Sequence, residues 1–137
     1  MSDCIFCKIA EKKIPSKIVH EDDTCIAFDD VNPQAPTHVL VIPRKHAASI
    51  AELNEADAGL LGHLMLTGNR VAKQKGIAEG GYRFVVNTGK NGGQTVFHLH
   101  LHVIPRILGD SLHRDLTALM PLRSDLDAIA AQIAENL

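Results

Sequence analysis

His98-Leu99-His100-Leu101-His102-Val103 alternates histidine with aliphatic side chains over six consecutive residues of a 137-residue chain. A period of two is the side-chain period of a β-strand, whereas on a helix the same histidines would fan out around the axis. In a strand the three imidazoles would share one face, with neighbouring rings about 6.6–6.8 Å apart along the chain. The pattern therefore predicts a strand at about 95–104 that has a histidine face and an apolar face.

The three aligned histidines indicate chemistry rather than simple coverage of a surface. A neutral imidazole has one donor and one acceptor, its charge changes near neutral pH, and it serves as a nucleophile or a metal ligand. Two histidines on one strand face can share a zinc ion, but the outer pair would lie about 13 Å apart, too far for all three to converge easily on one ion. We expect the central histidine to act as a nucleophile towards phosphorus or a carbonyl carbon, supported by its neighbours.

The composition is that of an ordinary soluble globular protein, with 45% hydrophobic and 22% charged residues. A chain of this length can bury a core without disulfides or metals, so a single domain over residues 1–137 is predicted. The formal net charge of −2 gives no general reason to expect a nucleic-acid or membrane partner, and no apolar run approaches the ~20 residues that span a bilayer. Three cysteines and no visible secretory signal favour the cytoplasm.

Turn residues and apolar periodicity place the other elements. Asn54, with Asp57 three residues later, is a candidate N-cap for the longest helix, and Gly76 is its stop signal. Strands grouped around one long helix predict an α+β domain with an antiparallel sheet and short flanking helices. Its core is assigned to about residues 4–106 and a C-terminal extension to 107–137. The expected elements are helices at 4–12, 55–75 and 124–137, and strands at 18–20, 24–28, 38–42, 82–87 and 95–104.

A glycine-rich segment, Asn87-Thr88-Gly89-Lys90-Asn91-Gly92-Gly93-Gln94-Thr95, precedes the histidines. Its backbone N–H groups could approach an anion closely, with amide and hydroxyl donors beside them, which is the chemistry of a phosphate site. A Gly-Gly pair between two strands is more often only a hairpin turn, and the segment is not a Walker-type loop. Taken alone, the segment leaves both interpretations open.

Cys4-Ile5-Phe6-Cys7 supplies a second group of potential ligands. A pair of cysteines separated by two residues is half of a zinc site. The alternatives are a redox dithiol, which usually follows a strand of a βαβ unit not visible here, and two thiols packed as small hydrophobic groups. Cys25 falls within an expected core strand and is predicted to be inert.

Residues 94–103 are similar to the histidine-triad motif of the HIT superfamily, in which three histidines alternate with apolar residues. The segment Asp30–His38 and the following Val41-Ile42-Pro43 resemble the nucleotide-binding part of its Hint branch. The resemblance extends over roughly residues 4–106 in a consistent order. It implies a homodimer of HIT-like domains that hydrolyses or transfers a nucleotide at its α-phosphate, through a covalent nucleotidyl-histidine intermediate and with no metal required for catalysis. The implied substrates are purine nucleoside phosphoramidates or related nucleotides.

The resemblance also implies a role for each matching residue. His100 would be the nucleophile, with His98 and His102 orienting it and His38 completing the histidine cluster. The implied nucleotide-binding residues are Gly93, Gln94, Thr95 and Asn87 on the phosphate side, Asp30 at the ribose hydroxyls and Val31 beside the base.

Many bacterial members of the superfamily carry the same cysteine pair and complete a zinc site with two histidines. The matching residues of this chain are Cys4, Cys7, His46 and His98. The resemblance therefore implies a structural zinc ion.

The sequence after the triad departs from the Hint pattern. Ile104-Pro105-Arg106 stands where a Gly-Gly-Arg turn is usual, the chain has no tryptophan, and residues 106–137 follow the strand. The Ile-Pro-Arg ending is more like the diadenosine-polyphosphate branch, so hydrolysis of dinucleoside polyphosphates is an alternative activity. A nucleotide-binding interaction or regulatory module and a zinc-binding structural protein are the alternatives outside catalysis.

Overall fold

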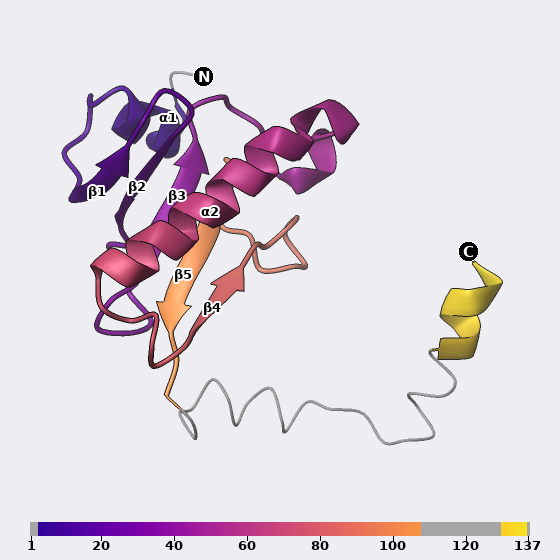
Figure 1. Cartoon of the computed structure of the whole chain (residues 1–137). Helices are drawn as coiled ribbons and strands as arrows, with labels where there is room; N and C mark the ends of the chain where they lie inside the picture. Colours follow the sequence, from indigo (N-terminus) through magenta and orange to yellow (C-terminus); the bar gives the residue numbers. More distant parts are fainter. Residues whose placement is uncertain (1–2, 108–129, 137) are drawn as a thin grey trace. The chain divides into compact units, whose positions relative to one another are not determined.

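The computed structural model in Figure 1 describes residues 3–107 and 130–136. The chain divides into two units, residues 1–106 and 107–137. In the second unit residues 130–135 are helical, and residues 124–129 and 137 of the helix predicted at 124–137 lie outside the described residues. The assignment of residues 1–137 to one domain stays a prediction.

The first unit is built on five strands: β1 (Ile18–Glu21), β2 (Cys25–Asp29), β3 (Val39–Pro43), β4 (Tyr82–Val85) and β5 (Leu101–Pro105). They form one antiparallel sheet in the order β1-β2-β3-β5-β4. β1 and β2 are the predicted hairpin. Pairing of β3 with β5 sets Leu40 opposite His102, so segments sixty residues apart in the sequence become neighbours. The predicted α+β class and antiparallel sheet are confirmed.

The described helices of this unit are α1 (Ile5–Ala10) and α2 (Ala58–Gln74), with short 3-10 turns at Ile50–Glu52 and Glu55–Asp57. Asn54 and Asp57 form a reciprocal capping box at the second turn, which leads directly into α2. Gly76, with a φ of 76°, follows the helix, as expected for a residue that must turn the chain after a helix end. Among the helices that the structure describes, none combines the length and apolar character needed to cross a membrane.

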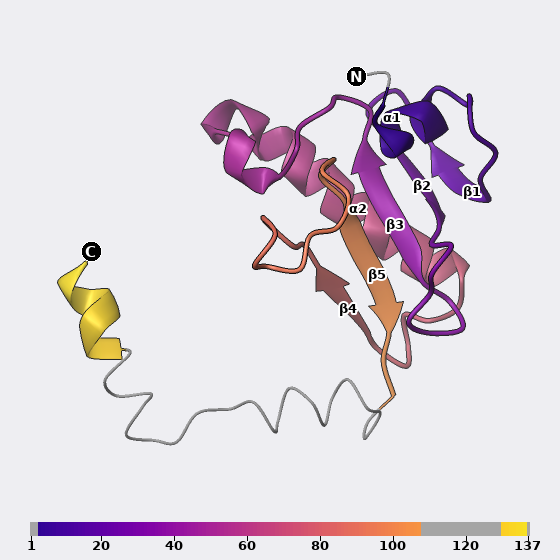
Figure 2. The ribbon, with the colours of Figure 1, turned by 180° about the vertical axis from the view of Figure 1, so that it is seen from behind.

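Side chains of β2 and β3 alternate between two cores, one on each face of the sheet. On one face, α2 packs over a core of Cys25, Ala27, Val39, Val41, Leu64, Val71, Ala72, Leu99, Leu101 and Val103. On the other face, α1 packs over Ile26, Phe28, Leu40 and Ile42 with its own Phe6, Ile9 and Ala10. Figures 1 and 2 show α2 in front of the sheet in one view and behind it in the other. The sheet is therefore a buried layer between α1 and α2.

The strand predicted at 95–104 is wrong in its first half, because β5 begins only at Leu101. Continued pairing with β3 would set residue 99 opposite Pro43, which has no N–H to donate to a sheet ladder. The N–H of Leu99 instead donates to the carbonyl of Ala47 over 2.7 Å. His98 and His100 consequently lie on an irregular segment, and only His102 lies in regular strand. Alternating residue types do not reveal where a strand loses its partner.

Candidate functional site

A cavity of about 540 Å³ opens on the α1 face of the sheet. Its apolar lining includes Ile5, Phe6, Ile9, Ile14, Phe28 and Leu40. Its polar lining includes Asp30, Asn87, Thr95, His100 and His102. A largely apolar cavity of this size with a few converging polar groups is typical of a small-molecule site.

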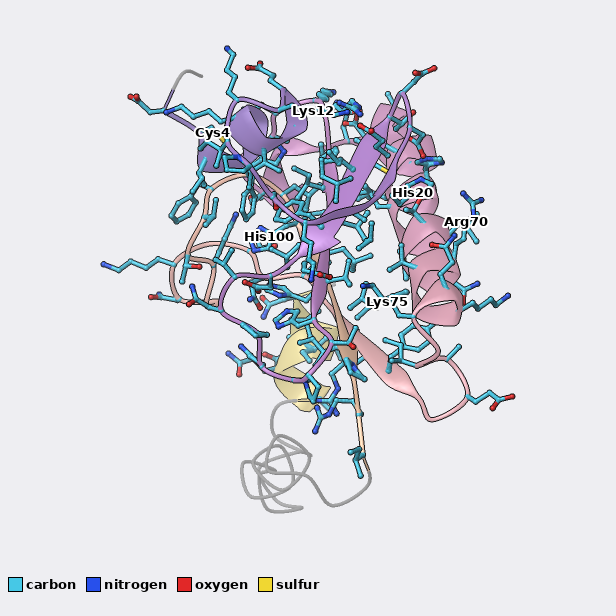
Figure 3. All side chains as sticks on the ribbon, turned by 90° about the vertical axis from the view of Figure 1, so that its left-hand side faces the viewer. Cys4, Lys12, His20, Arg70, Lys75 and His100 are labelled. Carbon is cyan, nitrogen blue, oxygen red and sulfur yellow. The ribbon has the colours of Figure 1, made fainter. Side chains whose placement is uncertain are left out.

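His100 is held in a single tautomer by the backbone. Its Nδ1–H donates to the carbonyl oxygen of His98 over 2.8 Å, so the lone pair is on Nε2 at the other side of the ring. The ring lines the cavity and is almost fully buried, and the ring of Phe6 packs edge-on against it with centroids 5.1 Å apart. An imidazole with a free Nε2 lone pair in a shielded cavity has the form required of a nucleophile. Figure 3 shows His100 in the middle of the molecule.

His38 and His102 form a second fixed pair beside His100. The backbone N–H of Gln34 donates to Nδ1 of His38 over 3.0 Å, so the proton of that ring is on Nε2. This Nε2 lies 2.9 Å from Nδ1 of His102 and 3.4 Å from Oδ2 of Asp30. His102 accepts at Nδ1 and keeps its own proton on Nε2, which is buried and finds no acceptor among the described residues. His102 itself lines the cavity.

Both rings of this pair are neutral near pH 7. Burial lowers the pKa of His102 to about 4, with smaller contributions in the same direction from charge on His100 and His38. Burial also lowers the pKa of His38, against the opposing influence of Asp30. Each ring therefore keeps one donor and one acceptor nitrogen at neutral pH, which is what the contact between them requires.

The residues predicted to bind nucleotide mostly line the same cavity. Asp30, at the end of β2, accepts the N–H of Asn32 with one carboxylate oxygen and approaches His38 with the other. Val31 is 86% exposed at the cavity lining, so an apolar surface there is left for a ligand to cover. The remaining lining residues of the prediction are Asn87, Gly93 and Thr95.

Gln94 is not among the residues that line the cavity. It is buried, its Oε1 accepts the N–H of Gly89 over 2.9 Å, and its Nε2 donates to the carbonyls of Val96 (3.0 Å) and Ala48. All three hydrogen bonds go to backbone. The side chain thus holds the glycine-rich loop against the segment after β3, and the geometry favours a role in shaping the loop over direct contact with phosphate.

Cys4, Cys7, His46 and His98 converge beside α1, away from the cavity lining. Nδ1 of His98 lies 3.3 Å from Sγ of Cys4 and 3.5 Å from Sγ of Cys7. Nδ1 of His46 lies 3.4 Å from Sγ of Cys7 and 3.2 Å from Nδ1 of His98. Around a tetrahedral zinc ion with ordinary bond lengths, S···N and N···N separations are about 3.5 and 3.3 Å. The four ligand atoms therefore fit one zinc ion.

The protonation of these groups agrees with a metal site. Nε2 of His98 donates to the carbonyl of Pro43 over 2.8 Å, which leaves Nδ1 unprotonated and directed at the sulfurs. Burial, together with the neighbouring Cys4, raises the pKa of Cys7 to about 11, so the thiol stays protonated near pH 7 unless a cation joins it. A zinc ion would supply that charge and take the place of the proton.

Two contributions to the site were missed by the sequence interpretation. One is the apolar side of the cavity that α1 contributes. The spacing of Phe6 and Ile9 indicates a buried helix face, but it does not indicate that this face lines a cavity. The other is the main chain of His98, whose carbonyl fixes the tautomer of His100 while its ring belongs to the cysteine cluster. No sequence signal distinguishes a backbone role from a side-chain role.

The HIT domain model matches residues 11–107 of this chain. An uncharacterized HIT-like protein of Synechococcus elongatus is 54% identical over 102 residues, which are 74% of this chain and 89% of the relative. The solved structure of a HIT family hydrolase from Clostridium thermocellum is 45% identical with a TM-score of 0.77, covering 80% of this chain and 96% of that one. A zinc-bound histidine triad family protein from Mycobacterium smegmatis is 32% identical with a TM-score of 0.70, covering 81% of this chain and 80% of that one.

Proposed function

The chain belongs to the HIT family, and on this premise we propose that it is a nucleotide hydrolase or transferase that cleaves the bond to the α-phosphate of purine nucleoside phosphoramidates or related nucleotides. The observation that carries the proposal is the tautomer of His100, whose Nδ1–H is committed to a carbonyl and whose Nε2 lone pair is free. The closer assignment to the Hint branch stays a prediction.

The proposed reaction has two displacements at phosphorus. In the first, Nε2 of His100 forms a bond to phosphorus, the P–N bond of the phosphoramidate breaks, and the amine leaves with a proton from water. The phosphorylated ring carries a positive charge, which the Nδ1–H shares with the carbonyl of His98. In the second, water attacks phosphorus, the bond to His100 breaks, and the nucleoside monophosphate leaves as the proton returns to solvent. Splitting the reaction in this way replaces one difficult step by two easier ones.

The other polar groups would hold the phosphate during both displacements. The Nε2–H of His102, which has no acceptor among the described residues, would donate to a phosphoryl oxygen, where negative charge grows. Asn87 and Thr95 line the same cavity and would add an amide and a hydroxyl donor. His38, by donating to Nδ1 of His102, keeps the Nε2–H of His102 in place.

The nucleoside would occupy the rest of the cavity. Asp30 would accept the ribose hydroxyls, since it is a carboxylate at the cavity lining. The apolar residues of α1, with Val31, would cover the faces of a purine, which offers more area for such contact than a pyrimidine. Purine preference is therefore part of the proposal.

We propose that Cys4, Cys7, His46 and His98 hold a structural zinc ion. When bound, the ion would cross-link α1 to the segment that presents His100 and would contribute to folding. The chemistry above uses only protein groups and takes no step at the metal.

The chain is also proposed to be a homodimer. β4 is the edge strand of the sheet next to β5, and Met65 and Leu66 of α2 expose 52% and 66% of their surface. An edge strand has unpaired backbone N–H and C=O groups, and exposed apolar side chains are in contact with water. Association with another chain removes both disadvantages. A second copy of the chain would cover them.

Cleavage of dinucleoside polyphosphates is the second candidate, favoured by the sequence Ile104-Pro105-Arg106, which runs from the last residues of β5 to the residue after it. The same nucleophile would serve, with a nucleotide instead of an amine as the leaving group. The ratio of kcat/KM for the two substrate types decides between these alternatives.

The covalent intermediate provides the direct test. The protein is mixed with adenosine 5′-phosphoramidate, AMP release is followed by chromatography, and samples quenched within the first turnover are examined by intact-mass spectrometry. A protein heavier by one adenylate, with the adduct mapped to His100, is the expected result. Two results together would exclude the mechanism. Wild type would release AMP with no adduct in the quenched samples, and a variant without the His100 imidazole would release AMP as well.

A further inference from the structure

A second cluster of donor atoms lies at the turn between β1 and β2, apart from both sites described above. Oδ2 of Asp22 is 2.9 Å from Nε2 of His20 and 2.9 Å from Nε2 of His63, which projects from α2. Sγ of Cys25, the first residue of β2, lies 3.7 Å from the same oxygen. Figure 3 shows His20 beside α2, while Cys4 lies beside α1. These four residues belong neither to the lining of the cavity on the α1 face nor to the cysteine cluster.

The carboxylate of Asp22 is held rigidly by the main chain. Its Oδ1 accepts the N–H groups of Thr24 and Cys25, each over 2.8 Å, and Nε of Arg44 donates to the Asp22 carbonyl over 2.7 Å. Burial acts to raise the pKa of Asp22, but the hydrogen bonds from His20, the two backbone N–H groups and His63 outweigh it and hold that pKa below its usual range. Oδ2 is therefore an ionised oxygen fixed in position, with two imidazole nitrogens and a thiol around it.

The separations among these atoms are close to those around a metal ion. Ligand atoms of His20, Asp22 and Cys25 all lie within 4.8 Å of one another. Around a tetrahedral zinc ion the N···O and S···O separations are about 3.3 and 3.5 Å, against 2.9 and 3.7 Å here. Small shifts of the His20, Asp22 and Cys25 side chains would bring their three ligand atoms to a common centre. His63 contacts only the Asp22 oxygen and lies outside this group, so its ring would have to move further to join it.

Charge and accessibility also suit a divalent ion. The carboxylate of Asp22 and a thiolate at Cys25 would together neutralise two positive charges. Burial raises the pKa of Cys25, so that its thiolate needs a neighbouring cation to form. The side chains of His20, Asp22 and His63 are 16%, 30% and 37% exposed, which leaves a route for the ion from solvent.

We propose that His20, Asp22 and Cys25 bind a second transition-metal ion of the zinc class, with His63 of α2 as the fourth ligand. Mixed nitrogen, oxygen and sulfur ligands select such an ion over magnesium or calcium, which prefer oxygen alone. Three ligands come from the β1–β2 hairpin and one from the helix. The ion therefore cross-links the edge of the sheet to α2.

Metal content of two matched variants tests the site. Asp22→Asn removes the charged ligand oxygen but keeps an Oδ1 acceptor for the two turn N–H groups, and Asp23→Asn makes the same charge change at the exposed neighbour. After equilibrium dialysis against zinc, we expect Asp22→Asn to hold one ion per chain fewer than wild type and Asp23→Asn to match wild type. Equal zinc content in both folded variants overturns the proposal and leaves a hydrogen-bonded cluster only.

Cobalt supplies a second measurement that does not depend on Asp22. In a Cys4→Ser, Cys7→Ser background, which leaves Cys25 as the remaining thiol, added Co²⁺ should give a thiolate-to-cobalt absorption band that Cys25→Ser abolishes. If Asp22→Asn lacks a native circular dichroism spectrum, His20→Asn and His63→Asn replace it, each expected to weaken zinc binding at least tenfold. Unchanged zinc affinity in both histidine variants refutes the site as well.

Discussion

The Nδ1–H of His100 donates to the backbone carbonyl of His98 over 2.8 Å, while the imidazole of His98 faces the cysteine pair. One residue therefore serves two sites, with its main chain at one and its side chain at the other. The carbonyl is present whatever side chain stands at position 98, so the tautomer of His100 does not depend on the His98 ring.

Replacing the nucleophile should abolish turnover without unfolding the protein. Asn at position 100 can still donate from its side-chain amide to the His98 carbonyl but has no equivalent of Nε2. We expect His100→Asn to lower kcat/KM by at least about 10³-fold, because the covalent route is lost. Steady-state kinetics beside circular dichroism check this. Activity within tenfold of wild type in a folded His100→Asn would contradict the assignment.

Removing the predicted zinc ion should lower stability far more than turnover. His46 is exposed, so His46→Gln removes one ligand with little effect on packing. We expect chelation to lower the Tm of wild type by at least about 5 °C, because metal binding energy adds to folding energy. In an Asp22→Asn background, which removes the second proposed ion, His46→Gln should show a low Tm that chelation barely changes, with kcat within about tenfold of the background protein. Thermal unfolding with and without chelator distinguishes this from packed thiols, which predict no response to chelator in either protein.

The buried histidine pair should make the protein less stable in mild acid. The pKa of His102 is lowered to about 4 in the folded protein, against about 6.5 in an unfolded chain. Between these values the unfolded chain takes up a proton that the folded ring does not, so the free energy of unfolding falls as pH falls from about 7 to 4. Below about pH 4 the folded ring is also protonated and this loss stops.

The comparison for this pH effect is His102→Asn, which removes the titrating ring. Urea unfolding at pH 7 and at pH 5 should give a smaller loss of stability for the variant than for wild type. An equal loss in the two proteins would mean that His102 contributes nothing to the acid sensitivity.

Gln94 should act on the loop through its hydrogen bonds. Gln94→Ala leaves the N–H of Gly89 and the carbonyls of Ala48 and Val96 without that partner, which costs about 1–3 kcal/mol of stability. Gln94→Glu should cost at least as much, because it keeps the acceptor but loses both donations and buries a charge. Gln74→Ala, at an exposed position, is the control and should change stability by less than about 0.5 kcal/mol. Chemical denaturation that gives equal values for Gln94→Ala and Gln74→Ala would refute this role.

Charged residues on α2 should break the proposed homodimer. We expect wild type to run as a dimer in light scattering, and the double variant Met65→Lys, Leu66→Lys to run as a monomer, since two like charges would face each other across the interface. Ile50→Lys changes another exposed apolar residue off this helix and should stay dimeric. A monomeric wild type, or a dimeric double variant, would refute this interface.

Local sequence signals were sufficient for the elements whose stability is local. The β1–β2 hairpin depends on contacts within a few residues and stands as predicted. Asn54 and Asp57 also form a local cap, but it begins the 3-10 turn Glu55–Asp57, and α2 itself begins only at Ala58. The alternation of buried residues along β2 and β3 likewise follows from backbone geometry alone. The HIT superfamily assignment from the triad is confirmed by the family match over residues 11–107.

Other features could not be read from neighbouring residues. The predicted strand at 95–104 fails before Leu101 because a strand exists only where a partner supplies hydrogen bonds, and Pro43 ends that supply. Gln94 was assigned to phosphate, but its amide donates to the carbonyl of Ala48, 46 residues away, and to that of Val96. The donor cluster around Asp22 was not foreseen. His20 and Cys25 meet Asp22 through the geometry of the hairpin turn, and His63 joins them only when α2 packs on the hairpin.

By itself, the sequence determined the class of fold and singled out the candidate side chains, which are the three histidines, the cysteine pair and Asp30. Tertiary structure alone decided what each of those side chains does. Imidazole is donor, acceptor, ligand or nucleophile according to which nitrogen its neighbours leave free. For His98 that neighbour comes from a distant strand, and for His38 and His100 it is a nearby backbone group in a conformation that the fold imposes. Pro43, Gln34 and the carbonyl of residue 98 make that choice for His98, His38 and His100.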